Sequence, residues 1–268
     1  MKKLSIDAFT LKIIAITSMG LHHTVMILWE FFPMWLHLTL YVMRGVTFPI
    51  MAFFLTEGFR RTSNIKRYML RLLIFAIIAQ VPYTLAFQAF QLNIIFTILL
   101  SLFCLRLYDK WYVNEKKQTR FVVVFLLLLL VSFVTEGAGI GPVLILLFHV
   151  IKDEKKRRTI PLIFWGAMMI IGNLFMQAML MLGDMTGVHM LAGAEGFLKL
   201  ELLMSSYYVV SLGVFGVIPL LRAYNGERGR RAKFLFYTFY PLHFAILAAI
   251  AYKLGVTDFS IITNLFSS

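Results

Sequence analysis

Residues 162–182 read LIFWGAMMIIGNLFMQAMLML, and residues 121–133 read FVVVFLLLLLVSF. Neither stretch contains a charged residue, and 60% of the whole 268-residue chain is hydrophobic. A soluble domain of this length cannot hide so much apolar surface, whereas a lipid bilayer can. The sequence therefore predicts an integral membrane protein.

Similar apolar segments continue on both sides of these stretches. Each is close to the ~20 residues that a helix needs to cross the hydrocarbon core. They are continuously apolar rather than alternating, which favours helices over a β-barrel. We therefore predict an all-α polytopic bundle of about nine transmembrane helices, forming one domain over residues 1–268. The expected spans are residues 8–30, 34–59, 67–88, 92–109, 118–135, 137–151, 160–182, 200–222 and 233–254.

Basic residues gather on every second connection between these spans, which is the positive-inside pattern. The basic connections are residues 60–71, 106–120, 152–158 and 222–233. This pattern predicts a cytoplasmic N-terminus and a C-terminus on the outer side. The net charge of +13 then reflects topology and attraction to anionic lipid headgroups, so it does not call for nucleic acid as a partner.

Ionisable residues fall inside or at the ends of the apolar segments, among them His22, His23, Arg44, Glu57 and His243. A charged side chain at the bilayer centre costs about 3 kcal/mol, so each of these residues is a candidate functional group. The direction of each span places His23, Arg44 and His243 in one broad layer of the membrane. Because adjacent helical residues are ~100° apart, we expect one of His22 and His23 to line a cavity and the other to bond a neighbouring helix.

These residue types fit the chemistry of acyl transfer. A neutral histidine can remove a proton from a hydroxyl or amine, and an arginine can stabilise an oxyanion. We assign these roles to His23 and Arg44, with Asn93 as a second oxyanion donor. Three arginines at the cytoplasmic ends of the spans are candidates for binding the phosphates of an anionic cofactor, namely Arg60, Arg61 and Arg71.

The acceptor side of the site is assigned to the segment around Pro241. Proline removes a backbone donor, so the helix can kink there and open a polar pocket. We expect His243, Tyr237 and Tyr240 to shape this pocket, with His22 and Glu57 among the substrate-binding residues. The chain has one cysteine and no metal-spaced cysteines, so no metal is expected.

Two other interpretations remain open from the residues alone. The same histidines could form the relay of a proton-coupled secondary transporter. Alternatively, the buried polar groups could only pack helices together in a non-catalytic membrane partner or lipid-flipping scaffold.

The order of short motifs along nearly the whole chain resembles the TraX family. The motifs include the segment 11–16 leading to His23, Arg44-Gly45, Phe48-Pro49, Glu57-Gly58-Phe59, Arg71-Leu72, Pro82-Tyr83, Leu92-Asn93 and the segment 239–243, which reads FYPLH. The resemblance implies a link to N-terminal acetylation of pilin. It also implies kinship with transmembrane acyltransferases that use cytoplasmic acetyl-CoA, in which an early-span histidine and a second-span arginine correspond to His23 and Arg44.

Two residues depart from the family pattern: Thr84 stands at a position of an acid, and the pattern has Asp-His where this chain has His22-His23. If that aspartate orients the catalytic histidine, another acceptor must replace it here, or the mechanism differs. The resemblance and the residues together predict a bacterial plasma-membrane acetyltransferase. Acetyl-CoA is the expected acyl donor, and the acceptor is an amine or hydroxyl of a pilin-like peptide, a glycan or a lipid on the outer side.

Overall fold

The computed structural model describes residues 5–137, 139–185 and 193–257, and it is built from helices. Within these ranges the β-structure consists of two isolated parallel bridges, Ile6 with Tyr224 and Leu92 with Thr135. The helices, in chain order, are α1 (Ala8–Ile27), the 3₁₀ turn η1 (Trp29–Phe31), α2 (Met34–Arg61), α3 (Ile65–Phe87), α4 (Ile94–Leu107), the π-helix η2 (Tyr108–Asn114), α5 (Gln118–Ser132), α6 (Ile140–Val150), α7 (Glu154–Arg157), α8 (Ile160–Met185), α9 (Gly193–Arg222) and α10 (Lys233–Lys253).

The all-α prediction is confirmed, and a helix occupies each of the nine predicted segments. Five segments of the described chain are long and apolar enough to cross a membrane: Ala8–Ile27, Met34–Arg61, Ile65–Phe87, Glu154–Met179 and Phe234–Lys253. Helices α5 and α6 are apolar but shorter than a full span. The number of crossings, predicted as nine, therefore stays a prediction.

Polar caps mark where several helices begin. The Asp7 carboxylate accepts from the Thr10 amide at 2.8 Å and starts α1. The side chains of Asn64 and Asn93 accept from the Arg67 and Ile95 amides and start α3 and α4. Because the first amides of a helix have no partner within it, such caps determine where each apolar run becomes helical.

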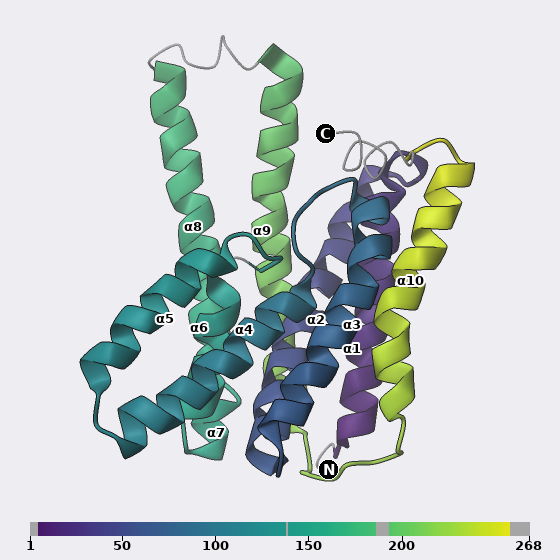
Figure 1. The fold of residues 1–268 in the computed structure, drawn as a ribbon. Coiled ribbons are helices and arrows are strands. Elements are labelled where there is room, and N and C mark those ends of the chain that lie inside the picture. Colours follow the sequence, from purple (N-terminus) through teal and green to yellow (C-terminus); the bar gives the residue numbers. More distant parts are fainter. Residues whose placement is uncertain (1–4, 138, 186–192, 258–268) are drawn as a thin grey trace, which may run out of the picture.

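The connections rich in basic residues meet at one end of the molecule (Figure 1). This end, which we call the basic end, holds the start of α1, the α2–α3 turn, α7 and the α9–α10 connection. The alternation predicted from the basic clusters is thus present in the fold. A cytoplasmic location of this end remains a prediction.

Helix α2 packs closely against α1 and α9, whereas α10 packs mainly against α3. The α2–α9 crossing depends on two glycines, since a Cβ on Gly45 would lie 2.0 Å from the Val210 carbonyl oxygen and one on Gly213 would lie 2.0 Å from that of Val42. Backbones at this crossing therefore touch directly, as small residues allow between membrane helices.

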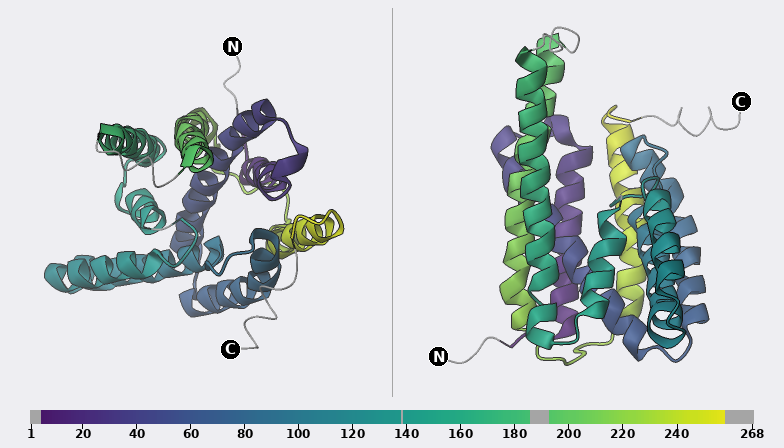
Figure 2. Two further views of the ribbon diagram at one scale, coloured as in Figure 1. Left: turned by 90° about the horizontal axis from the view of Figure 1, so that it is seen from above. Right: turned by 90° about the vertical axis from the view of Figure 1, so that its left-hand side faces the viewer.

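The α4–α5 hairpin extends away from the other helices (Figure 2). Along α5 the large apolar side chains are exposed, among them Leu126, Leu127 and Leu130. The outer face of α3 is similar, with Ile74, Ile77 and others exposed. Apolar surface on this scale is unusual in a soluble protein and suits contact with lipid.

Candidate functional site

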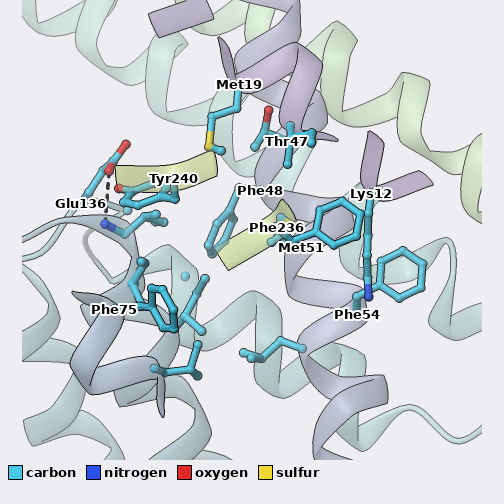
Figure 3. Close-up of a pocket in the computed structure, with 18 of the residues that line it drawn as sticks. Lys12, Met19, Thr47, Phe48, Met51, Phe54, Phe75, Glu136, Phe236 and Tyr240 are labelled. Atoms are coloured by element: carbon cyan, nitrogen blue, oxygen red, sulfur yellow. Dashed lines mark hydrogen bonds between the residues drawn. The ribbon is translucent and has the colours of Figure 1, made fainter. Parts of the chain in front are cut away.

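A cavity of about 920 Å³ lies between α1, α2, α3 and α10, with contributions from the ends of α4 and α6. Figure 3 shows its central wall, where apolar side chains such as Met19, Phe48, Met51 and Phe75 face one another. Polar and charged groups gather toward its two ends. One group contains Lys12, Tyr68, Arg71, Arg228, Arg230 and Tyr237, and the other contains His22, His23, Arg44, Tyr83, Glu136 and Tyr240.

The direction of the helices orders these two groups along the membrane normal. Helix α1 leaves the basic end, so Lys12 lies near that end and His23 lies 11 residues further along. At ~1.5 Å per residue, this separation corresponds to about 16 Å. The cavity is thus a long apolar passage with cations at the basic end and a histidine–arginine site at depth.

His23 and His243 form the central pair of the deep site. The Nδ1 atom of His23 lies 2.9 Å from Nε2 of His243, and Nδ1 of His243 lies 2.9 Å from the Phe239 carbonyl oxygen. Both imidazoles are buried. His23 lines the cavity, and His243 stands behind it on α10. The structure therefore brings together two histidines that are 220 residues apart in the sequence.

This chain of hydrogen bonds determines the tautomers of both neutral rings. A carbonyl oxygen can only accept, so Nδ1 of His243 carries a proton. Its Nε2 is then an acceptor and receives the Nδ1–H of His23. The Nε2 atom of His23 is left with a free lone pair, and it forms no hydrogen bond with another residue of the described chain. A histidine in this state can accept a proton.

Arg44 lies on α2 and lines the same cavity. Among the described residues, its guanidinium forms no ion pair or hydrogen bond, although it interacts electrostatically with the Glu136 carboxylate. The neighbouring Gly45 is at the close crossing with α9, so packing holds this turn of α2 in place. Arg44 therefore presents an unpaired cation to the cavity.

His22 also lines the cavity, so the expectation that only one of the two adjacent histidines would do so is wrong. The cavity extends around this face of α1 far enough to meet both side chains. The His22 ring lies edge-on to Tyr41, with centroids 5.5 Å apart. Its Nε2 atom is buried and has no hydrogen-bond partner in the described chain.

Glu136 was not among the predicted site residues, and it lies between the predicted spans 118–135 and 137–151. The structure holds this loop against the start of α4, because the Glu136 amide donates to the Leu92 carbonyl at 2.7 Å and its carboxylate accepts from the Ile94 amide at 3.2 Å. The Tyr240 hydroxyl is buried and lies beside this carboxylate (Figure 3). An acid between two apolar spans was the available signal.

Only one of the three arginines predicted to bind a cofactor lines the cavity. Arg71 does so, and its Nε donates to the Tyr237 hydroxyl at 2.8 Å. Arg60 donates to the His149 carbonyl, and Arg61 is paired with Glu57. The residues that join Arg71 at the basic end of the cavity are Lys12, Arg228 and Arg230, which the sequence analysis did not select.

Tyr237 lies at this basic end rather than on the acceptor side where it was predicted. It is one helical turn before Tyr240, and that turn moves it toward Arg71 and Phe75. Lys12 lies opposite, over the rings of Phe54 at 4.9 Å and Phe236 at 5.6 Å (Figure 3). Aromatic rings thus surround the cations of the cavity mouth.

Glu57, predicted to bind substrate, forms a structural ion pair instead. Its carboxylate accepts from Arg157 at 2.7 Å, and Arg157 also donates to Thr56, Glu154 and the Phe148 carbonyl. Glu57 does not line the cavity. We therefore leave it out of the site.

Asn93 also has a structural role. Its side-chain amide donates to the Ala76 carbonyl at 2.8 Å and to Gln80 at 2.9 Å, and its oxygen caps α4. With these bonds made, the amide has no donor left for a substrate oxyanion. Asn93 is fully buried outside the cavity lining, so the oxyanion role predicted for it is not supported.

No group of three or more metal-ligating side chains occurs among the described residues. The fold and the cavity thus define a class: an α-helical membrane protein in which a buried histidine pair and an unpaired arginine face one passage. The chain belongs to the TraX family, whose model, described as TraX protein, matches residues 8–251.

One relative extends over nearly the whole chain. The probable fimbrial assembly protein FimC, serogroup H1, of Dichelobacter nodosus is 28% identical over 266 residues, which cover 92% of this chain and 97% of the relative. No solved structure matches the chain significantly. The resemblance to TraX seen in the motifs is therefore confirmed by the family match, and the name of the relative refers to fimbrial assembly.

Proposed function

We propose that this protein is a membrane-embedded acyltransferase that moves an acetyl group from acetyl-CoA to an amine or hydroxyl acceptor. The observation that carries the proposal is the position of His23. Its Nδ1 is bonded to His243, its Nε2 is free, and the ring lines a cavity whose other end is lined by cations. A base at depth and an anion-binding mouth are the two parts that a CoA-dependent transferase requires.

The basic end of the cavity is the proposed entrance for the donor. Lys12, Arg71, Arg228 and Arg230 bring four cations to this mouth, and the phosphates of CoA are multiply anionic. Beyond the mouth, the apolar walls accept the flexible pantetheine arm. The distance of about 16 Å between the levels of Lys12 and His23 is comparable to an extended arm that carries a thioester. The basic end is then the cytoplasmic side, in agreement with the positive-inside pattern.

At the deep end, His23 and Arg44 perform the chemistry. Nε2 of His23 takes the proton of the acceptor as its nitrogen or oxygen attacks the thioester carbonyl carbon. Arg44 donates hydrogen bonds to the oxyanion of the tetrahedral intermediate. When the carbon–sulfur bond breaks, the proton on His23 passes to the CoA thiolate.

If the aspartate of the family pattern orients the catalytic histidine, His243 is the acceptor that replaces it here. A carboxylate beside a catalytic histidine fixes its tautomer and orientation. Here Nε2 of His243 accepts the His23 Nδ1–H, and the Phe239 carbonyl fixes the tautomer of His243 in turn. A neutral acceptor stabilises a histidinium less than a carboxylate does. The main contribution of His243 is therefore to orient the His23 ring rather than to stabilise its positive charge.

The acceptor enters from the side opposite the basic end, near Glu136, Gln91 and Tyr207. The relative's role in fimbrial assembly favours a pilin-like peptide, while a surface glycan or lipid headgroup has the same reactive groups. The proposed location is the bacterial plasma membrane.

The first test uses purified full-length protein in detergent with radiolabelled acetyl-CoA. We expect the wild type to bind acetyl-CoA and to release CoA slowly, and we expect His23→Ala to lose the release by about 100-fold or more, as loss of a general base predicts. The matched control is His37→Gln. His37 is a buried histidine outside the cavity that contacts the Trp29 and Phe32 carbonyls, which a glutamine amide can also reach.

Equal CoA release by His23→Ala and the wild type would remove His23 as the base. A well-folded wild type that does not bind acetyl-CoA would overturn the transferase proposal and favour the proton-coupled transporter.

A further inference from the structure

A second pocket, of about 460 Å³, opens at the basic end, outside the cavity described above. It lies where the α2–α3 turn meets η2 and the end of α6. Its polar lining includes Arg60, Arg106, Lys110 and the hydroxyl groups of Thr62 and Ser63. Thr62 lines both spaces, but the cations of the two are different.

The charge of this pocket is unbalanced. Its one carboxylate, Asp109, is already paired with His149 at 2.7 Å. Within the described chain, Arg106 forms no ion pair or hydrogen bond, and Lys110 has only a distant contact with Glu115, at 3.9 Å. Arg60 is paired with Glu154, outside the pocket, at 3.7 Å. The charge left without a close partner is therefore that of Arg106 and Lys110, and it favours an anionic ligand.

The backbone holds these cations in position. Arg106 and Lys110 are four residues apart at the α4–η2 junction, and like charges at this spacing destabilise a helix unless an anion lies between them. Arg60 faces them from α2, held by its bond to the His149 carbonyl at 2.9 Å. The segment that carries Lys110 is a π-helix, a conformation that is rare and frequently found at functional sites.

Apolar surface adjoins the cations on the membrane side. Phe59 and Ile65 form part of the pocket wall. Phe103 is exposed one turn before Arg106 on α4, further from the basic end. A ligand with a phosphate at the membrane surface and a hydrocarbon chain below it matches this order of groups.

We propose that this pocket binds the phosphate headgroup of an anionic phospholipid, with an acyl chain lying along α4 toward Phe103. Arg60, Arg106 and Lys110 contact the phosphate, and the Thr62 and Ser63 hydroxyls donate to its oxygens. This site does not depend on acyl transfer, since it uses none of the residues of the proposed mechanism.

The test measures binding of phosphatidylglycerol and phosphatidylcholine to the purified full-length protein by native mass spectrometry and thermal stability. We expect the wild type to prefer phosphatidylglycerol. In the double variant Arg106→Gln/Lys110→Gln the affinity should fall about 25-fold, at about fivefold for each cation. The matched control, Lys155→Gln/Lys156→Gln, removes two exposed cations of α7 at the same end and should change the affinity less than about threefold.

Equal losses in the two double variants would mean general attraction to charge and would overturn the site. Displacement of phosphatidylglycerol by inorganic phosphate or CoA at equal concentration would overturn the lipid assignment in favour of a soluble phosphate compound. If the double variant does not fold, Lys110→Gln alone, which changes an exposed side chain, gives the same comparison. The affinity for phosphatidylglycerol should then fall about fivefold.

Discussion

Arg157 and Arg44 are two arginines with opposite surroundings. The Arg157 side chain is 1% exposed, and its donors meet two carboxylates, a hydroxyl and a carbonyl. Arg44 faces a cavity and forms no ion pair with any described residue. A cation with all its partners present holds helices together, whereas one without partners is available to a ligand. The difference between them separates the structural network of the basic end from the candidate active site.

Loss of Arg157 should have the largest effect. Arg157→Met leaves the half-buried Glu57 carboxylate with only its exposed partner Arg61, and we expect the free energy of unfolding to fall by about 3–5 kcal/mol. Thermal or denaturant unfolding in detergent measures this. Arg61→Gln, which removes the exposed pair, should cost no more than about 1 kcal/mol. Equal losses in the two variants would contradict a structural role specific to Arg157.

Arg44→Gln should show the reverse behaviour, with a functional loss and an intact fold. Removal of one oxyanion donor lowers the turnover number by about 100- to 1,000-fold in enzymes of known mechanism. We expect that loss in CoA release here, with a change in unfolding free energy below about 1 kcal/mol. Arg44→Lys should restore part of the activity. If Arg44→Gln unfolds as readily as the Arg157 variant, the two arginines do not differ as the structure indicates.

The third comparison, with the smallest expected effect, sets Arg71 against Arg61. Arg71→Gln removes one cation of the cavity mouth and should weaken acetyl-CoA binding about tenfold, as for one charged hydrogen bond. Turnover at saturation should change little. Arg61→Gln, outside the cavity, should leave the dissociation constant within about twofold. A stronger effect of Arg61 than of Arg71 in equilibrium dialysis would restore the phosphate-binding role first predicted for Arg61.

The helices were predictable because each apolar run is long and its ends carry charge or a cap. The pairing of His23 with His243 was predictable only as a shared depth, since span direction gives a level in the membrane but not a rotation about the helix axis. Contact between them depends on how α10 packs, which no local pattern encodes. For the same reason, only one of His22 and His23 was expected to line the cavity.

The errors at the basic end have a related physical origin. Arg60, Arg61 and Arg71 look alike in sequence, but the position of each on α2 or α3 decides whether it meets a carbonyl, a carboxylate or the cavity. Arg157 was counted as one of many topological charges, and its burial under α2 became visible only in the fold. Glu136 lies between two predicted spans, and its hydrogen bonds to Leu92 and Ile94 at the start of α4 became visible only in the structure.

The bond between His23 and His243 also joins two groups of helices. Helix α1 packs on α2, which the glycine crossing fastens to α9, whereas α10 packs mainly on α3 and touches α1 much less. The hydrogen bond therefore spans the weaker seam between an α1–α2–α9 unit and an α3–α10 unit. Any widening of that seam to admit or release a substrate would separate the two imidazoles. The orientation of the proposed base thus depends on contact between the two units.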